Sequence, residues 1–144
     1  MQSLLTQASR RFASILVIFL TIFVTTKALA LSPEEKMRTE ALLTELGKQQ
    51  NLTFTRNGSG HSAPEAESHL RLKLGKTEKR LQTTEQFIDN VASKSSITGE
   101  EYQVTDAQGK VTSANQYLHD LLKNNVDKKP NNPFYPLPIN EAPQ

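Results

Sequence analysis

One short pattern precedes apolar residues at helical spacing at four places in this chain, and there it predicts where helices begin. A serine or threonine is followed three residues later by a glutamate or glutamine, which allows each of the two side chains to cap the start of a helix. The four copies begin at Ser32, Ser62, Thr83 and Ser113. The first two copies also place a proline in the first helical turn, where a missing amide proton is harmless. The sequence therefore predicts about four helices.

Alternating apolar residues lie between the predicted helices and are typical of short strands. Leu52 and Phe54 alternate on one side of a segment, as do Tyr102 and Val104. A turn after the second of these segments would let residues 110–112 return as a partner strand. Residues 57–60 read Asn-Gly-Ser-Gly and are predicted to be a turn or loop. We expect an α+β fold, with about four helices and a small sheet of two or three strands.

The helix that begins at Ser62 carries the most continuous apolar stripe. Its members recur at intervals of three and four residues, which places them on one helix face. They are Ala63, Ala66, Leu70, Leu74, Thr77 and Leu81. Gly75 lies inside this stripe and costs about 1 kcal/mol relative to alanine in a helix. The pattern leaves open whether the helix continues through Gly75 or breaks there.

Residues 1–30 have the layout of a secretory signal peptide. Arg10 and Arg11 precede the apolar residues 12–24, and the segment ends in small residues, the last of which is Ala30. A membrane-spanning helix needs about 20 apolar residues, so this run is too short to be a permanent anchor. We expect cleavage after Ala30 and a product in the periplasm or outside the cell.

The remaining chain divides into a domain and a tail. Five of the seven prolines lie in residues 130–144, and such a composition favours an extended, disordered segment. We therefore expect a single α+β domain over residues 31–126 and a disordered, proline-rich tail over residues 127–144.

Charge and cysteine content exclude several classes of function. The absence of cysteine excludes disulfides, thiolate metal sites and a lipid-modified cysteine. Three of the seventeen basic residues lie within residues 1–30, whereas all fifteen acidic residues follow them. The exported product is thus slightly acidic, and neither its charge nor its compartment favours nucleic acid.

A second periodic set on the helix from Ser62 is basic. These residues follow spacings of four, three and four along one flank of the apolar stripe, and they are His69, Lys73, Lys76 and Arg80. Arg71 lies on the other flank. An exposed row of cations would attract anionic envelope lipids or glycans weakly. The alternative is a solvated helix face whose long side chains cover the edge of the core.

No metal, cofactor or catalytic centre is predicted. His61 and His69 are eight residues apart and could lie near one site, but a metal requires more ligands than two histidines. Ser93, Ser95 and Ser96 form a serine-rich loop without a nucleophile motif around it, and such clusters are typical of turns.

The middle of the chain resembles the YfeK-like family of small exported bacterial proteins, over roughly residues 33–122. The segments that carry the resemblance are Asn57-Gly58, His61-Ser62, Glu65-Ala66, His69 to Leu74, Phe87-Ile88, Ser95 to Gly99, and Tyr102. Glu101 stands where that family has a proline before the tyrosine. The resemblance implies a periplasmic bacterial protein of unknown function, and it implies no activity, substrate or cofactor.

Three classes of function remain open. We expect a non-enzymatic binding or interaction module whose partner is an anionic envelope lipid or glycan, or an envelope protein. One alternative is a small envelope hydrolase or transferase that uses His69, and the other is a structural envelope protein. A concave pocket that joined His69, Arg71 and the loop 95–102, with a strongly shifted histidine pKa, would favour an enzyme or a specific binder.

Overall fold

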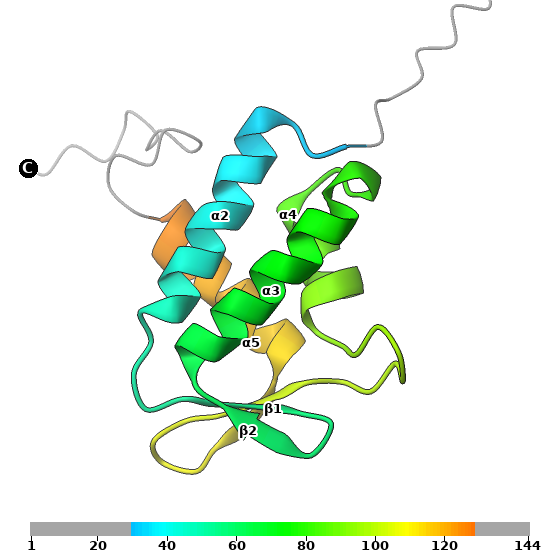
Figure 1. Cartoon of the computed structure of the whole chain (residues 1–144). Coiled ribbons are helices and arrows are strands. Elements are labelled where there is room, and N and C mark those ends of the chain that lie inside the picture. The colour runs from blue at the N-terminus through cyan, green and yellow to red at the C-terminus, as the bar shows by residue number, and fades with distance from the viewer. Residues whose placement is uncertain (1–29, 129–144) are drawn as a thin grey trace, which may run out of the picture.

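The computed structural model describes residues 30–128, and within them helices stand over one face of a sheet (Figure 1). Residues 1–29 and 129–144 are outside the described part, so the signal peptide and most of the proline-rich tail remain expectations. The α-helices in the described part are α2 (Pro33–Gly47), α3 (Ala63–Thr77), α4 (Thr84–Phe87) and α5 (Ala114–Leu121). The expected helix number is thus confirmed.

Three of the α-helices are extended by tighter or wider turns. α3 is followed by a 3₁₀ turn, and α4 and α5 each continue into a π-helical segment. These extensions are η1 (Glu78–Arg80), η2 (Ile88–Ala92) and η3 (Leu122–Asp127). None of the helices in the described part has both the length and the apolar character needed to cross a membrane.

All four predicted helix starts are capped by the expected serine or threonine. The second copy forms the full reciprocal cap, in which the Ser62 side chain accepts from the backbone of Glu65 and the amide of Ser62 donates to Oε2 of Glu65 at 2.7 Å. At the first copy, Oγ of Ser32 accepts from the amide of Glu35. The pattern predicted that the Glu35 carboxylate would accept from the amide of Ser32. It accepts instead from the amide of Thr84, at 2.7 Å.

The sheet is antiparallel and has four strands rather than the expected two or three. In the order β2-β1-β3-β4, the strands are β2 (Ser59–His61), β1 (Thr53–Arg56), β3 (Gln103–Thr105) and β4 (Val111–Ser113). The strand that the pattern missed is β2. Asn57 and Gly58 have φ values of 48° and 75°, which is the geometry of a two-residue hairpin turn. This turn reverses the chain into β2, whose residues have no apolar alternation of their own.

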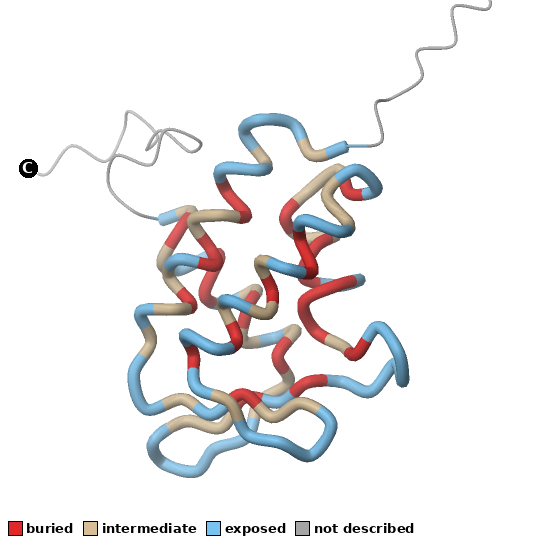
Figure 2. Tube along the Cα trace, viewed as in Figure 1, coloured by how far each residue is buried: buried red, intermediate tan, exposed pale blue. Residues whose placement is uncertain are grey.

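The core lies between the helices and the upper face of the sheet (Figure 2). Three leucines of α2 are fully buried, namely Leu42, Leu43 and Leu46. α2 and α3 run antiparallel side by side (Figure 1). Most of the predicted stripe of α3 is buried, with Leu70 only 1% exposed, whereas Thr77 is half-buried. α3 continues through Gly75 without a break but ends at Thr77, so Leu81 is buried beyond the helix and not on it.

The folded domain extends one residue further than expected. Asp127, which we had assigned to the tail, is the last residue of η3. Its carboxylate accepts two hydrogen bonds from the buried guanidinium of Arg38. This long-range contact holds the end of η3 against α2, and proximity along the sequence could not have revealed it.

Candidate functional site

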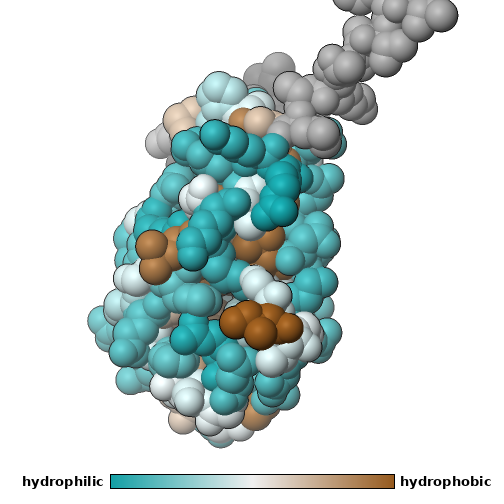
Figure 3. Space-filling model, turned by 45° about the vertical axis from the view of Figure 1, so that its right-hand side comes forward, coloured by the Kyte–Doolittle hydropathy of each residue, from teal (hydrophilic) through white to brown (hydrophobic). Residues whose placement is uncertain are grey.

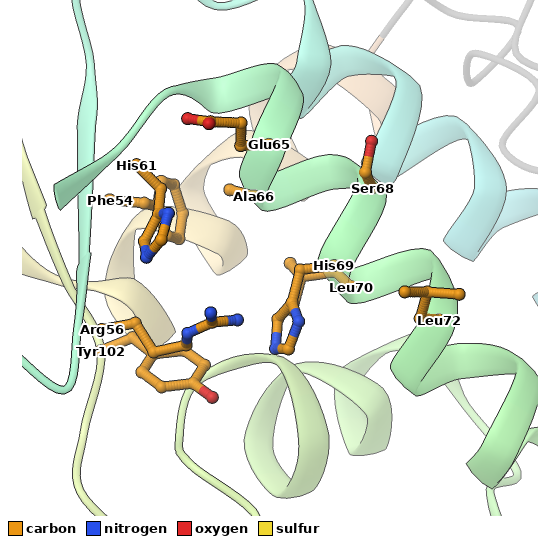
Figure 4. A pocket seen from close by; sticks show the side chains of 10 residues that line it. All are labelled: Phe54, Arg56, His61, Glu65, Ala66, Ser68, His69, Leu70, Leu72 and Tyr102. Carbon is orange, nitrogen blue, oxygen red and sulfur yellow. The ribbon is translucent and has the colours of Figure 1, made fainter. Parts of the chain in front are cut away.

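A cavity of about 230 Å³ lies between α3 and the strands β1 and β2. We call it the α3–sheet cavity. Figure 4 shows the imidazole rings of His61 and His69 and the guanidinium of Arg56 directed into the same space, with the ring of Tyr102 beside them. The carboxylate of Glu65 also borders the cavity, but it is turned toward the start of α3, where it caps Ser62 (Figure 4).

The strand register brings these side chains together. Phe54 and Arg56 are two residues apart in β1 and therefore lie on the same face of the sheet. Phe54 pairs with His61 across the hairpin and with Val104 on the other side, which places the histidine next to Phe54 on that face. Tyr102 immediately precedes β3 and is 4% exposed.

His69 is the most unusual residue of the cavity. Its Nε2 atom is buried and has no hydrogen-bond partner in the described part of the chain. Burial lowers the pKa of His69, and the nearby positive charges of Arg56, Lys73, His61 and Lys76 lower it further. A buried polar atom without a partner costs free energy, so this nitrogen is suited to receive a hydrogen bond from a ligand or to donate one.

Lys73 is not part of an exposed row, contrary to our expectation. It is only 9% exposed, and its Nζ donates to the carbonyl oxygen of Lys94 at 2.6 Å and lies 3.5 Å from the hydroxyl of Tyr102. Burial lowers the pKa of Lys73 to about 8, and the charge of Arg56 contributes. The amine thus ties the loop after η2 to α3.

The other residues of the predicted basic set are separated from the cavity. Lys76 is exposed on α3, and Arg80 lies in η1, where the spacing of the α-helix no longer applies. Arg71 is turned toward α2 and pairs with Glu67 at 2.8 Å and with Glu40. Of the five predicted residues, the structure places His69 alone among those that line the cavity.

Sequence reasoning missed Arg56 and Tyr102 as site residues. A usable signal for Arg56 was present, since it continues the alternation that placed Leu52 and Phe54 on one side of a strand. Tyr102 had been named as a strand residue that alternates with Val104 and as the end of the loop 95–102. Burial raises the pKa of Tyr102, although Arg56 and a hydrogen bond with Ser95 act in the opposite direction. Its hydroxyl is therefore neutral and available for hydrogen bonding.

A histidine–carboxylate pair lies outside the cavity. Nε2 of His119 is 2.8 Å from Oδ1 of Asp89, which also accepts from Asn115. The hydrogen bond with His119 lowers the pKa of Asp89. The side chain of Asp89 is 52% exposed, so water competes with His119 for hydrogen bonds to its carboxylate. The part of the chain that the structure describes contains no group of three or more metal-ligating side chains.

Comparisons with known proteins agree with the resemblance seen in the sequence. A family model described as "Family of unknown function (DUF5329)" matches residues 33–126. The chain is similar to "Uncharacterized protein YfeK" of Salmonella typhimurium strain LT2, with 57% identity over 68 residues. That match covers 47% of this chain and 57% of the relative, so the chain spans little more than half of the relative's length. No solved structure matches the chain.

Proposed function

Because this chain belongs to the DUF5329 family, whose function is unknown, we propose its role from the α3–sheet cavity. It is a non-enzymatic binding module of the bacterial envelope, and it holds the anionic group of a ligand in that cavity. The observation that carries the proposal is the buried, unpartnered Nε2 of His69 beside the guanidinium of Arg56. Together they offer hydrogen-bond donors to an anion. The site is partly buried, and charge-assisted hydrogen bonds are strong there.

The electrostatics of the cavity favour an anion over a cation. Several nearby positive charges act on His69, and each of them lowers its pKa. Glu65, the acidic residue among those that line the cavity, is already engaged at the helix start by two hydrogen bonds from Ser62. A cation would meet repulsion at this site, whereas an anion would relieve it.

Binding is better supported than catalysis. A histidine that acts as a general acid or base is usually oriented by a hydrogen bond from a third group. A carboxylate commonly supplies that bond, and the acidic residue among those that line the cavity, Glu65, is already engaged by Ser62. The alternative of an envelope hydrolase or transferase that uses His69 therefore has less support.

Export from the cytoplasm is part of the proposal. Its support is the basic, apolar and small-residue layout of residues 1–30. The expected first residue of the product, Leu31, packs against the core, and its backbone nitrogen donates to the carbonyl oxygen of Glu78 at 3.3 Å. A product that begins at Leu31 would keep this contact.

An NMR titration of residues 31–144 tests the anion site directly. Benzoate and inorganic phosphate are added at constant ionic strength, and the amide and imidazole signals of the cavity residues are followed. We expect at least one probe to shift them, and we expect Arg56→Gln or His69→Gln to weaken the effect. The matched control is Lys76→Gln combined with Arg80→Gln, which removes two exposed cations from the predicted row.

Two results would contradict the anion site. If neither probe moves a cavity signal, the cavity is not an anion site. If the exposed double variant loses binding while the cavity variants retain it, the attraction belongs to the surface.

A further inference from the structure

We infer that the ligand is a monocarboxylate whose apolar body is about the size of one aromatic ring. This inference rests on the proposed anion site and deepens it.

The walls of the α3–sheet cavity are largely apolar and well packed. Phe54, Ala66, Leu70 and Tyr102 are each no more than 7% exposed, so they form a fixed surface within the core. Leu72 lines the same cavity but is 67% exposed, which places it at the mouth. An inorganic anion would leave these apolar walls facing water, whereas an apolar group would cover them.

The volume of the cavity sets the size of that apolar group. An apolar cavity of about 150 Å³ is sufficient to bind benzene. The α3–sheet cavity measures about 230 Å³, so one ring and a carboxylate fit within it. The aromatic rings of Phe54 and Tyr102 offer faces and edges against which a ring can pack.

The charge of the cavity limits the ligand to one negative charge. Arg56 is the permanently charged cation among the lining residues, and it can bind a carboxylate through two parallel hydrogen bonds. The amine of Lys73 is held by the carbonyl of Lys94, and Lys76 is exposed. At pH 7 the lowered pKa of His69 leaves its imidazole neutral in the free protein. A dianion such as a phosphate monoester would then bring a second charge that Arg56 alone does not compensate, and that charge would be costly in a partly buried site.

The surface favours a small ligand over a membrane. On the face shown in Figure 3, apolar side chains form small, separate patches among hydrophilic ones. Insertion into a bilayer requires a larger continuous apolar face. This face is thus not suited to insertion into a membrane.

Four matched probes test the inference on the chain 31–144 at pH 7. Benzoate has the charge and the ring, benzamide has only the ring, acetate has only the charge, and phenyl phosphate adds a second charge. We expect calorimetry to show that benzoate binds at least about tenfold more tightly than each of the others. Vesicles of phosphatidylglycerol serve as the membrane comparison.

Variants locate the binding within the cavity. Arg56→Gln is expected to weaken benzoate about tenfold and to leave benzamide unchanged. Arg71→Gln is the matched control. Arg71 is an arginine like Arg56, but it lies on α3 and is turned toward α2, where it pairs with Glu40. If Arg56→Gln does not fold, His69→Gln replaces it, and thermal unfolding of each variant establishes that it is folded.

The possible outcomes separate this inference from the proposed function. If acetate binds as tightly as benzoate, or if phenyl phosphate binds more tightly, the inference is wrong while the anion site stands. If benzamide binds as tightly as benzoate, the negative charge contributes nothing to binding, and the inference and the anion site both fail. If the protein binds the vesicles and not benzoate, the inference is also wrong. If no probe occupies the cavity, both proposals fail together.

Discussion

Arg38 and Asp127 form a two-pronged ion pair that joins the first helix of the described domain to its last turn. Nε of Arg38 donates to Oδ1 of Asp127 at 3.0 Å, and Nη2 donates to Oδ2 at 2.8 Å. The guanidinium is almost completely buried and also lies 2.7 Å from Glu85. The hydrogen bond with Asp127 raises the pKa of Arg38, and burial acts against it.

Asp127→Asn is expected to lower the free energy of unfolding by about 1–2 kcal/mol. The change removes the charge that accepts two hydrogen bonds from the buried arginine, while Glu85 still pairs with the guanidinium. Urea unfolding of residues 31–144 measures the effect. The matched control is Asp120→Asn, an exposed aspartate whose replacement should change stability by less than about 0.5 kcal/mol. Equal midpoints for the two variants would show that the pair contributes nothing.

Gly75→Ala is expected to stabilise the protein by about 1 kcal/mol. α3 continues through Gly75, and a Cβ at this position would meet no atom within 4 Å. Alanine has the higher helix propensity by about this amount. Gly109→Ala is the control and should destabilise, because Gly109 has a φ of 81°. A lower urea midpoint for Gly75→Ala would mean that the helix needs flexibility there.

The stability of the domain is expected to rise between about pH 8 and pH 9.5 because of Lys73. Its pKa is lowered from 10.5 to about 8 in the folded state, so the unfolded chain binds this proton more tightly. The free energy of unfolding therefore increases as the proton is lost. Lys73→Met should remove this rise, and Lys76→Met, which changes an exposed lysine of the same helix, should retain it. Chemical unfolding at several pH values supplies the comparison, and identical slopes would refute the assignment.

Ligand binding in the cavity is expected to take up a proton at His69. In the free protein its pKa is lowered by burial and by the surrounding charges, whereas a bound carboxylate favours the charged imidazole. Affinity for benzoate should therefore increase as the pH falls from 7 to about 5.5. Calorimetry in two buffers with different ionisation enthalpies counts the protons. His69→Gln should abolish the uptake, and His119→Gln should not. Uptake that survives in His69→Gln would assign it to another group.

The exported product is expected to begin at Leu31 and to be released by osmotic shock. The apolar run of residues 12–24 is too short to span a membrane and is followed by a small-residue cleavage site. Fractionation and N-terminal sequencing test this expectation. A chain that begins at Met1 and remains in the membrane fraction would contradict it.

Much of the fold could be predicted because the signals are local. Ser62 and Glu65 form their cap within one helical turn, and Leu70 and Leu74 share a face through the helical period alone. The fourth strand was missed because β2 is specified by the left-handed turn at Asn57 and Gly58, and its own residues show no apolar alternation.

The candidate site was predicted less well. Spacing placed His69 and Lys73 in one row, yet it could not show that the two would have different surroundings. Lys73 is buried because a loop from a later part of the chain supplies the carbonyl oxygen of Lys94. Arg71, on the opposite flank, is engaged by the acidic side chains of Glu40 and Glu67.

By itself, the sequence determined where helices begin, which face of α3 is apolar and that the domain is α+β. These features depend on hydrogen bonds and side-chain spacings between neighbouring residues. Only the tertiary structure decided that Arg56, His69 and Tyr102 would line one cavity, because they come from three different segments of the chain. Strand register and helix packing bring those segments together, and both depend on burial across the whole domain.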